Sequence, residues 1–233
     1  MKFGVVVFPG SNCDVDVYYL LRDVLEGDVE YIWHKESELH RFDAIILPGG
    51  FSYGDYLRPG AIARFSPVMQ SLQDFVEKGK LVLGICNGFQ ILAEAEMLPG
   101  AFCRNTHLQF RCSYVYLKVE NTNLPFTKEV GLGQILQMPV ANADGNYYVD
   151  EMQLKNMHQN GQVVFRYVDK WGEDSPAANP SGALANIAGV CNKRGNVLGM
   201  MPHPERAADT LLGSEDGLLI FDSMLKYLAA GKG

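Results

Sequence analysis

Short apolar runs alternate with amphipathic stretches through the first part of the chain. Helical spacing of apolar residues appears over Val15–Leu25 and again over Val68–Lys78. The apolar runs have the length and composition of buried strands, and they are Phe3–Phe8, Val29–Trp33, Ala44–Leu47 and Leu81–Ile85. Strands that are apolar on both faces and separated by helices are typical of parallel sheets. We therefore expect an α/β fold with a mostly parallel sheet flanked by helices.

The loops that follow three of these strands are unusual in composition. Pro9-Gly10-Ser11-Asn12 follows the first strand, Pro48-Gly49-Gly50 follows the third, and Cys86 follows the fourth. Ligands of parallel sheets bind beyond the carboxyl ends of the strands. The pattern therefore predicts a functional site where these three loops meet.

The second half of the chain has a less regular pattern. Strands are expected at Tyr114–Glu120, Gln134–Val140 and Gln162–Tyr167, an antiparallel hairpin at Ile187–Cys191 and Val197–Met201, and a closing amphipathic helix at Asp216–Leu228. Lys170–Ser181 is polar and rich in Pro, Gly and Ala, which indicates a long surface loop. Since no repeat or linker interrupts the chain, we expect a single domain over residues 1–233.

Composition and charge exclude several classes of function. A net charge of −7 argues against nucleic acid or an anionic membrane surface as a partner. No apolar run approaches the roughly 20 residues that span a bilayer, and the chain leads directly into a core strand without a targeting signal. The five cysteines are odd in number and lack a Cys-x-x-Cys pair, so neither a disulfide framework nor a metal site is indicated. We expect a cytoplasmic protein.

The junction at Cys86 has the layout of a nucleophile elbow. Gly84 and Gly88 flank the cysteine two residues away on each side, and the residues from Asn87 onward take helical spacing. Small neighbours permit the sharp strand-to-helix turn that holds a nucleophile above the sheet edge. The helix N-terminus beyond it favours a thiolate and can stabilise an oxyanion. Taken alone, the pattern also fits a small buried structural cysteine.

A histidine and a glutamate follow the predicted hairpin. His203 lies between Pro202 and Pro204, and Glu205 follows two residues after it. Extended residues two apart point the same way, so the carboxylate can reach one imidazole nitrogen and leave the other free to take a proton from a thiol. His34, His40, His107 and His158 lie among polar neighbours, and we expect them to be solvated.

Several blocks together resemble a known family. Gly-Ile-Cys86-Asn-Gly-Phe-Gln, Met-Pro-His203-Pro-Glu and Pro48-Gly-Gly resemble the triad-type, class I glutamine amidotransferases, which have a flavodoxin-like α/β fold. Longer strings are similar to the glutaminase subunits of phosphoribosylformylglycinamidine synthase, a ligase of purine biosynthesis: Phe8-Pro-Gly-Ser-Asn-Cys-Asp14, Pro48-Gly-Gly-Phe-Ser-Tyr-Gly-Asp-Tyr-Leu-Arg58 and Gly199-Met-Met-Pro-His-Pro-Glu-Arg206. The similarity runs nearly end to end.

The resemblance implies roles for individual residues. Cys86 would attack the side-chain amide of glutamine and form a glutamyl thioester, with His203 as acid and base and Glu205 orienting it. The backbone N–H groups of Gly50 and Asn87 would form the oxyanion hole. The side chain of Gln90 would help to seat the substrate, and the segment from Phe51 to Arg64 would lie at the mouth of the site or against a partner.

The resemblance also implies partners. The chain contains no Gly-x-x-x-x-Gly-Lys-Ser/Thr loop for a nucleotide. It would therefore carry no cofactor and would supply ammonia to a large synthetase subunit, which would bind ATP and Mg²⁺ and amidate formylglycinamide ribonucleotide. A small bridging subunit would complete the complex.

One block departs from the family pattern. The family usually has Ala-His-Gly-Glu-Gly after a proline, whereas Pro139 is followed here by Val-Ala-Asn142-Ala143-Asp144-Gly. No member of the expected triad is affected, so cysteine chemistry should persist.

Two other functions stay open. One is a different elbow-cysteine hydrolase or glutaminase; such relatives usually place the histidine directly after the nucleophile, where this chain has Asn87. The other is a catalytically idle subunit that only binds its partner, against which the intact Cys86, His203 and Glu205 argue.

Overall fold

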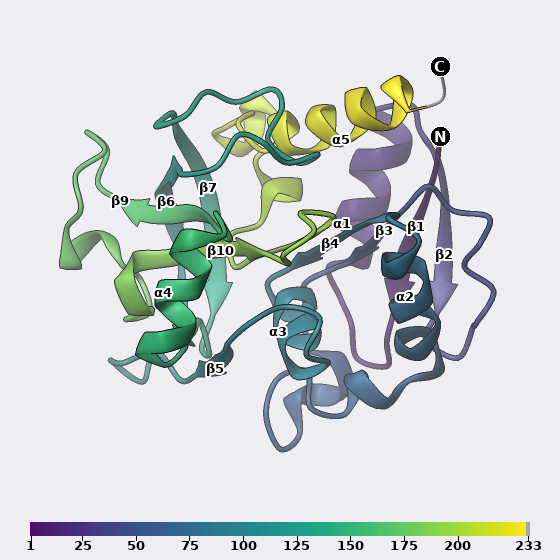
Figure 1. The fold of residues 1–233 in the computed structure, drawn as a ribbon, viewed down its shortest axis with the longest axis horizontal. Helices are drawn as coiled ribbons and strands as arrows, with labels where there is room; N and C mark the ends of the chain where they lie inside the picture. The colour runs from purple at the N-terminus through teal and green to yellow at the C-terminus, as the bar shows by residue number, and fades with distance from the viewer. Residues whose placement is uncertain (232–233) are drawn as a thin grey trace.

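A nine-stranded sheet forms the centre of the molecule (Figure 1). The structure is a computed structural model that describes residues 1–231. The strand order is β2-β1-β3-β4-β11-β10-β9-β6-β7. The first five strands of that order are parallel: β1 (Lys2–Val7), β2 (Asp28–Trp33), β3 (Ala44–Leu47), β4 (Leu81–Ile85) and β11 (Val197–Met200). The others pair antiparallel: β10 (Ile187–Cys191), β9 (Val163–Val168), β6 (Arg111–Val119) and β7 (Ile135–Asn142).

Helices cover both faces of the parallel half. From β1 the chain crosses to β2 at one edge of the sheet, and from β3 it crosses in the opposite direction to β4. Because crossovers are right-handed, these two connections lie on opposite faces. The helices α1 (Asp14–Tyr19) and α5 (Leu218–Ala230) accordingly lie on one side, and α2 (Pro67–Glu77) and α3 (Asn87–Glu94) on the other (Figure 1). The fold is thus the expected α/β class, with a mixed sheet whose parallel half carries the loops of interest.

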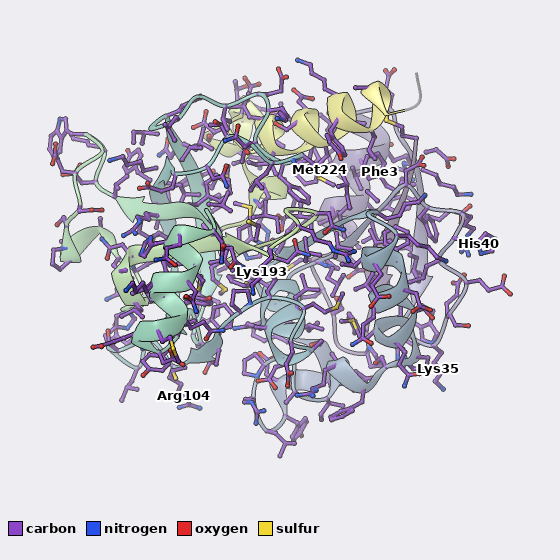
Figure 2. The ribbon with its side chains drawn as sticks, in the orientation of Figure 1. Phe3, Lys35, His40, Arg104, Lys193 and Met224 are labelled. Atoms are coloured by element: carbon purple, nitrogen blue, oxygen red, sulfur yellow. The ribbon has the colours of Figure 1, made fainter. Side chains whose placement is uncertain are left out.

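The core fills the layers between sheet and helices. The strands β3 and β4 are buried along their whole length, as their continuous apolar sequence requires. Figure 2 shows Phe3 and Met224 in the packed interior near α5, whereas Lys35, His40 and Arg104 project from the surface. Parallel β4 and β11 meet in register, with Gly84 opposite Gly199, so the residues that follow both strands lie at one edge.

Four elements and one side chain differ from the sequence-based expectations. The helix α4 (Glu151–Gln159) and the small sheet of β5 (Ala101–Cys103) and β8 (Asn146–Tyr148) were not predicted. The segment expected as one helix at Val15–Leu25 continues from α1 as a π-helix over Leu20–Val24. His34, expected to be solvated, is buried, because Tyr53 and Ser66 from distant segments cover its ring and bond to its Nδ1 at 2.9 and 3.3 Å.

Candidate active site

Cys86 occupies a strained turn between β4 and α3. Its φ of 48° and ψ of −105° lie in a region that residues with side chains rarely adopt. The turn depends on the two glycines beside it. A Cβ on Gly88 would lie 1.9 Å from the Leu47 carbonyl oxygen, and one on Gly84 would lie 2.8 Å from the Gly88 carbonyl oxygen. Strain of this kind persists where the surroundings enforce it, and it commonly marks a functional position.

His203 and Glu205 form a buried pair directly beyond β11. The imidazole Nδ1 lies 2.6 Å from Glu205 Oε1, and the two residues are 1% and 4% exposed. The backbone N–H of His203 donates to the Pro139 carbonyl at 2.8 Å, which ties the segment after β11 to β7. Within residues 1–231, His203 Nε2 and Glu205 Oε2 have no hydrogen-bond partner that would occupy them. The pair therefore leaves one imidazole nitrogen free for chemistry.

The imidazole and the thiol meet beside Gly49. A Cβ placed on Gly49 would lie 2.7 Å from His203 Cε1 and 3.4 Å from Cys86 Cβ, so both side chains pack against this glycine. Burial by itself lowers the pKa of His203, but the charges of Glu205 and Cys86 and the hydrogen bond to Glu205 raise it above the usual value. The imidazole is therefore held in its protonated form in the catalytic cavity.

A small cavity of about 150 Å³ opens onto this pair. Of the residues expected in the site, Cys86, His203, Gly50 and Gln90 line it. Glu205 lies behind His203, and Asn87 is buried next to the nucleophile, where its backbone N–H belongs to the first turn of α3. A volume below the usual range for drug-sized ligands fits a single small metabolite. The structure thus brings the six expected residues to one place.

Gly50 approaches the cavity in a conformation that needs glycine. Its φ is 121°, and a Cβ there would lie 2.7 Å from both Asn12 N and Asn12 Oδ1. Gly50 also forms an isolated bridge with Ser11. The loops after β1 and β3 are therefore tied together at the cavity wall, as their positions in the sequence predict.

The side chain of Asn87 connects the elbow to the loop after Gly50. Its Oδ1 accepts from the backbone N–H of Ser52 at 3.0 Å, and its Nδ2 donates to Asp55 Oδ1 at 3.2 Å and to Gln90 Oε1 at 3.0 Å. Gln90 Nε2 in turn donates to the backbone carbonyl of Asp144 at 2.7 Å. A chain of hydrogen bonds thus holds three walls of the cavity in fixed relation.

Cys13 and Arg206 are among the residues that line the cavity without having been assigned to it from the sequence. Cys13 was expected to be a structural thiol, but its Sγ accepts a hydrogen bond from Arg206 Nη2 at 3.0 Å within the cavity wall. Burial raises the pKa of Cys13 to about 12, although the Arg206 guanidinium acts in the opposite direction. Arg206 also pairs with Asp16 at 2.9 Å. Cys13 follows the first strand, and this position in the sequence could have indicated that it lies in the site.

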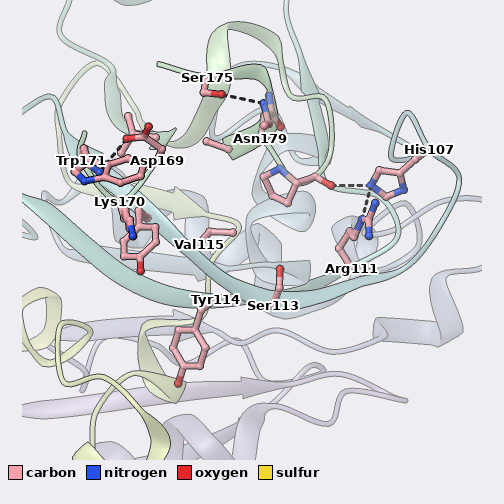
Figure 3. A pocket seen from close by; sticks show the side chains of 15 residues that line it. His107, Arg111, Ser113, Tyr114, Val115, Asp169, Lys170, Trp171, Ser175 and Asn179 are labelled. Atoms are coloured by element: carbon pink, nitrogen blue, oxygen red, sulfur yellow. Dashed lines mark hydrogen bonds between the residues drawn. The ribbon is translucent and has the colours of Figure 1, made fainter. Parts of the chain in front are cut away.

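A wider groove lies away from this chemistry. It has a volume of about 530 Å³ on the outer side of β6 and β9, beneath the loop around Trp171 (Figure 3). His107 and Arg111 form one end, where His107 bonds to the Pro180 carbonyl at 2.8 Å, and Lys170 stacks on Trp171 at the other. Neither Cys86 nor His203 lines it. Size alone therefore does not locate the reactive centre.

The sheet and the site together identify a class of enzyme. A strained cysteine on a strand-to-helix turn, served by a histidine and a glutamate that follow a neighbouring parallel strand, is the arrangement of the cysteine-dependent amidotransferases. A model of the CobB/CobQ-like glutamine amidotransferase domain matches residues 1–227. The chain belongs to this family and, within it, to the PurQ subunits of phosphoribosylformylglycinamidine synthase.

The similarity to individual relatives supports that assignment. The PurQ subunit of Aquifex aeolicus is 55% identical over 97% of this chain and 99% of that protein. The PurQ subunit of Moorella thermoacetica is 55% identical over 100% of this chain and 98% of that protein. In the solved structure of PurLQS from Thermotoga maritima, one chain superimposes with a TM-score of 0.86 at 42% identity, covering 97% of this chain and 98% of that one.

Proposed function

We propose that this chain hydrolyses glutamine and passes the ammonia to a synthetase partner that converts formylglycinamide ribonucleotide to formylglycinamidine ribonucleotide. The observation that carries the proposal is the buried His203–Glu205 pair, which leaves His203 Nε2 free in the cavity that the strained Cys86 also lines. The relatives support the biosynthetic context, since the proteins at 55% identity are PurQ subunits of this synthase. From this biosynthetic role we infer that the complex works in the cytoplasm.

The first half of the reaction transfers the glutamyl group to sulfur. The Cys86 thiolate attacks the amide carbon of glutamine, and the carbonyl oxygen gains the negative charge. The N–H groups of Gly50 and Asn87 stabilise that charge, each worth about 3–4 kcal/mol in comparable acyl-transfer sites. The His203 imidazolium gives its proton to the nitrogen as the C–N bond breaks. Ammonia leaves, and the glutamyl group remains on Cys86 as a thioester.

Water completes the cycle. The neutral His203 takes a proton from water, and the hydroxide adds to the thioester carbon. When the C–S bond breaks, glutamate leaves and Cys86 returns as a thiolate beside the imidazolium. Glu205 accepts the Nδ1–H throughout, so it fixes the tautomer and stabilises the charged ring. The three side chains thus act as one unit.

The synthetase partner closes over the mouth of the cavity. Phe51 and Phe110 line the cavity and are 46% and 51% exposed. Between the lining residues Asp55 and Pro59, Leu57 is 88% exposed. Apolar side chains of this size at a functional opening indicate a protein-protein contact. The solved structure of PurLQS from Thermotoga maritima contains a chain similar to this one, which supports a contact with partner subunits. ATP and Mg²⁺ bind on the synthetase, and a small subunit bridges the two.

Replacing the nucleophile separates the two activities of the complex. We expect Cys86→Ser to abolish synthesis from glutamine and to retain synthesis from added ammonium chloride, because the thiol acts only in ammonia release. Mass spectrometry after treatment with a glutamine-like diazo-ketone should find the adduct on Cys86. Equal loss of both activities, or labelling mainly at Cys13, would contradict the assignment. Such results would instead favour an idle binding subunit or a different cysteine hydrolase.

A further inference from the structure

Arg206 directly follows the catalytic glutamate, and the reaction above gives it no role. It lines the cavity, and its Nε lies 3.9 Å from Glu205 Oε1. The same oxygen lies 2.6 Å from His203 Nδ1. Among residues 1–231, Glu205 Oε2 has no hydrogen-bond partner. One oxygen of a buried carboxylate therefore faces two cationic side chains.

Two residues that follow β1 hold the guanidinium in this position. Asp16 Oδ2 accepts from Arg206 Nε at 3.0 Å, and Cys13 Sγ accepts from Arg206 Nη2 at 3.0 Å. The Cys13 thiol in turn donates to Asn12 Oδ1 at 3.4 Å. A guanidinium is planar and presents its N–H donors in a fixed fork, so two such bonds set its orientation. The approach of Arg206 to Glu205 is thus built into the fold.

Neither of these supports neutralises Arg206 in the interior. Burial raises the pKa of Cys13 to about 12, so its sulfur is a neutral thiol at physiological pH. Asp16 carries a charge, but its side chain is 43% exposed, and solvent therefore screens its pair with Arg206. The side chain of Glu205, by contrast, is 0% exposed. The buried carboxylate that the guanidinium approaches is the one that serves the catalytic histidine.

Arg206 is the one permanent cation that lines this cavity in the described part of the chain. The other titratable groups around the His203–Glu205 pair are acids: Cys86 and Cys13, Asp55 and Asp144 in the cavity wall, and the buried Tyr167 of β9, which interacts with Cys86. Each of these groups favours a protonated imidazole when it is charged. Only Arg206 acts in the opposite direction.

A second cation on Glu205 changes what His203 can do. The charges of Glu205 and Cys86 raise the pKa of His203 above its usual value, although burial lowers it. An imidazolium that is held too tightly is a poor acid, and it cannot become the neutral base that attack by water requires. A guanidinium beside the carboxylate opposes this, because it disfavours the protonated ring and weakens the attraction of Glu205 for it.

We propose that Arg206 is a positioning residue of the reaction, which shares the Glu205 carboxylate with His203 and so eases transfer of the imidazolium proton to the departing ammonia. The inference rests on the proposed function and deepens it. Asp16 and Cys13 act through Arg206, because they hold its guanidinium beside Glu205.

The pKa of His203 in the full-length chain measures this effect without turnover. NMR titration of the imidazole, assigned by comparison with His203→Gln, should give a pKa higher by about 0.5–1 in Arg206→Gln, because a partly screened cation has been removed. Arg206→Lys, which keeps the positive charge, should shift the pKa less than half as far. Arg41→Gln is the matched control. The Arg41 side chain is 31% exposed against 36% for Arg206, and it pairs with carboxylates outside the cavity.

Ammonia release by the complex with the synthetase partner gives a second readout. The alkaline limb of the pH profile of kcat/KM reports loss of the acid from the free enzyme. In Arg206→Gln this limb should move to higher pH by the same amount as the pKa of His203, since the imidazolium persists further into the alkaline range. A merely structural role would lower the rate at every pH and leave the limb in place.

An unchanged pKa of His203 in Arg206→Gln would overturn the proposal. A rise in Arg206→Lys as large as that in Arg206→Gln would also overturn it, because charge would then not be the cause. If the native complex released no ammonia from glutamine, the proposed function would fail, while the NMR titration would still decide the role of Arg206.

Discussion

At the residue scale, the catalytic unit rests on one short hydrogen bond between two buried groups. His203 and Glu205 are bonded at 2.6 Å with hardly any contact with solvent. In such a setting the carboxylate is the group that supports the imidazolium. Replacing either residue leaves the other buried without its hydrogen-bond partner, so the remaining residue can no longer perform its role.

The triad predicts strongly non-additive mutants. We expect His203→Ala and Glu205→Gln each to lower glutaminase turnover by about 10²–10⁴-fold, the range for general acid–base catalysis. The double mutant should lose far less than the product of the two single losses, because the residues act as a unit. Steady-state rates of ammonia release for the four proteins measure this. Strict multiplicativity would indicate that the two residues act independently.

The raised pKa of Asp55 predicts that removing its charge stabilises the folded protein. Folding raises the pKa of Asp55, so above pH 6 the ionised carboxyl lowers the free energy of unfolding. Below pH 4 the group is protonated in both the folded and the unfolded state, and this loss of stability disappears. We expect Asp55→Asn to raise the free energy of unfolding by about 1 kcal/mol at pH 8, after allowance for solvent screening of this partly exposed side chain. Urea unfolding at pH 8 and pH 4 tests the difference; an equal gain at both would exclude charge as its cause.

At the scale of elements, the parallel strands and their helices could be predicted because their signals are local. The strands at Ala44–Leu47 and Leu81–Ile85 are confirmed at the same bounds. The helix α4 was not predicted because its sequence is polar and Met157 is its one buried residue. Asp150 caps this helix by accepting a hydrogen bond from the backbone N–H of Gln153. The burial of His34 and the raised pKa of Asp55 depend on residues far away in the chain, and no local pattern announces them.

The turn at Cys86 predicts that an alanine substitution destabilises the protein much more at Gly88 than at Gly79. A Cβ on Gly88 would collide with the Leu47 carbonyl, whereas Gly79 after α2 has a φ of 78° and nothing within 4 Å of its Cβ position. Gly79→Ala should therefore cost only the backbone strain, about 1 kcal/mol. Gly88→Ala should cost at least about 3 kcal/mol and remove glutaminase activity, because β3 and α3 must separate. Chemical denaturation and ammonia release measure both effects. Similar losses for the two variants would contradict this account of the elbow.

At the scale of the whole molecule, the cavity, its loop and the apolar rim form one face toward the partner. At that face the side chains of Phe51, Leu57 and Phe110 are exposed. Residues 1–231 contain no helix long and apolar enough to cross a membrane. Large apolar side chains exposed at a functional opening indicate a contact with another protein at this face.

That face predicts that assembly controls both binding and turnover. We expect the free chain to be a poor glutaminase and the complex to turn over about 10²–10³-fold faster, the effect of one oxyanion hydrogen bond that is completed on docking. Leu57→Asp should weaken the complex and this activation. Leu132→Asp, on an exposed residue at the other end of β7, should do neither. Kinetics with and without the partner test the prediction, and an unchanged turnover number on assembly would contradict it.

The position of β11 links the chemistry to the order of synthesis. On the ribosome, β4 and the elbow emerge long before Val197–Met200, which pair with the second edge of β4 and lead to His203. Until then Cys86 lacks its base, and β4 has an unpaired apolar edge of the kind that invites aggregation. The nascent chain therefore cannot release ammonia while it is incomplete. The strand that closes the sheet is also the strand that activates the enzyme, so a molecule that has failed to finish folding is silent.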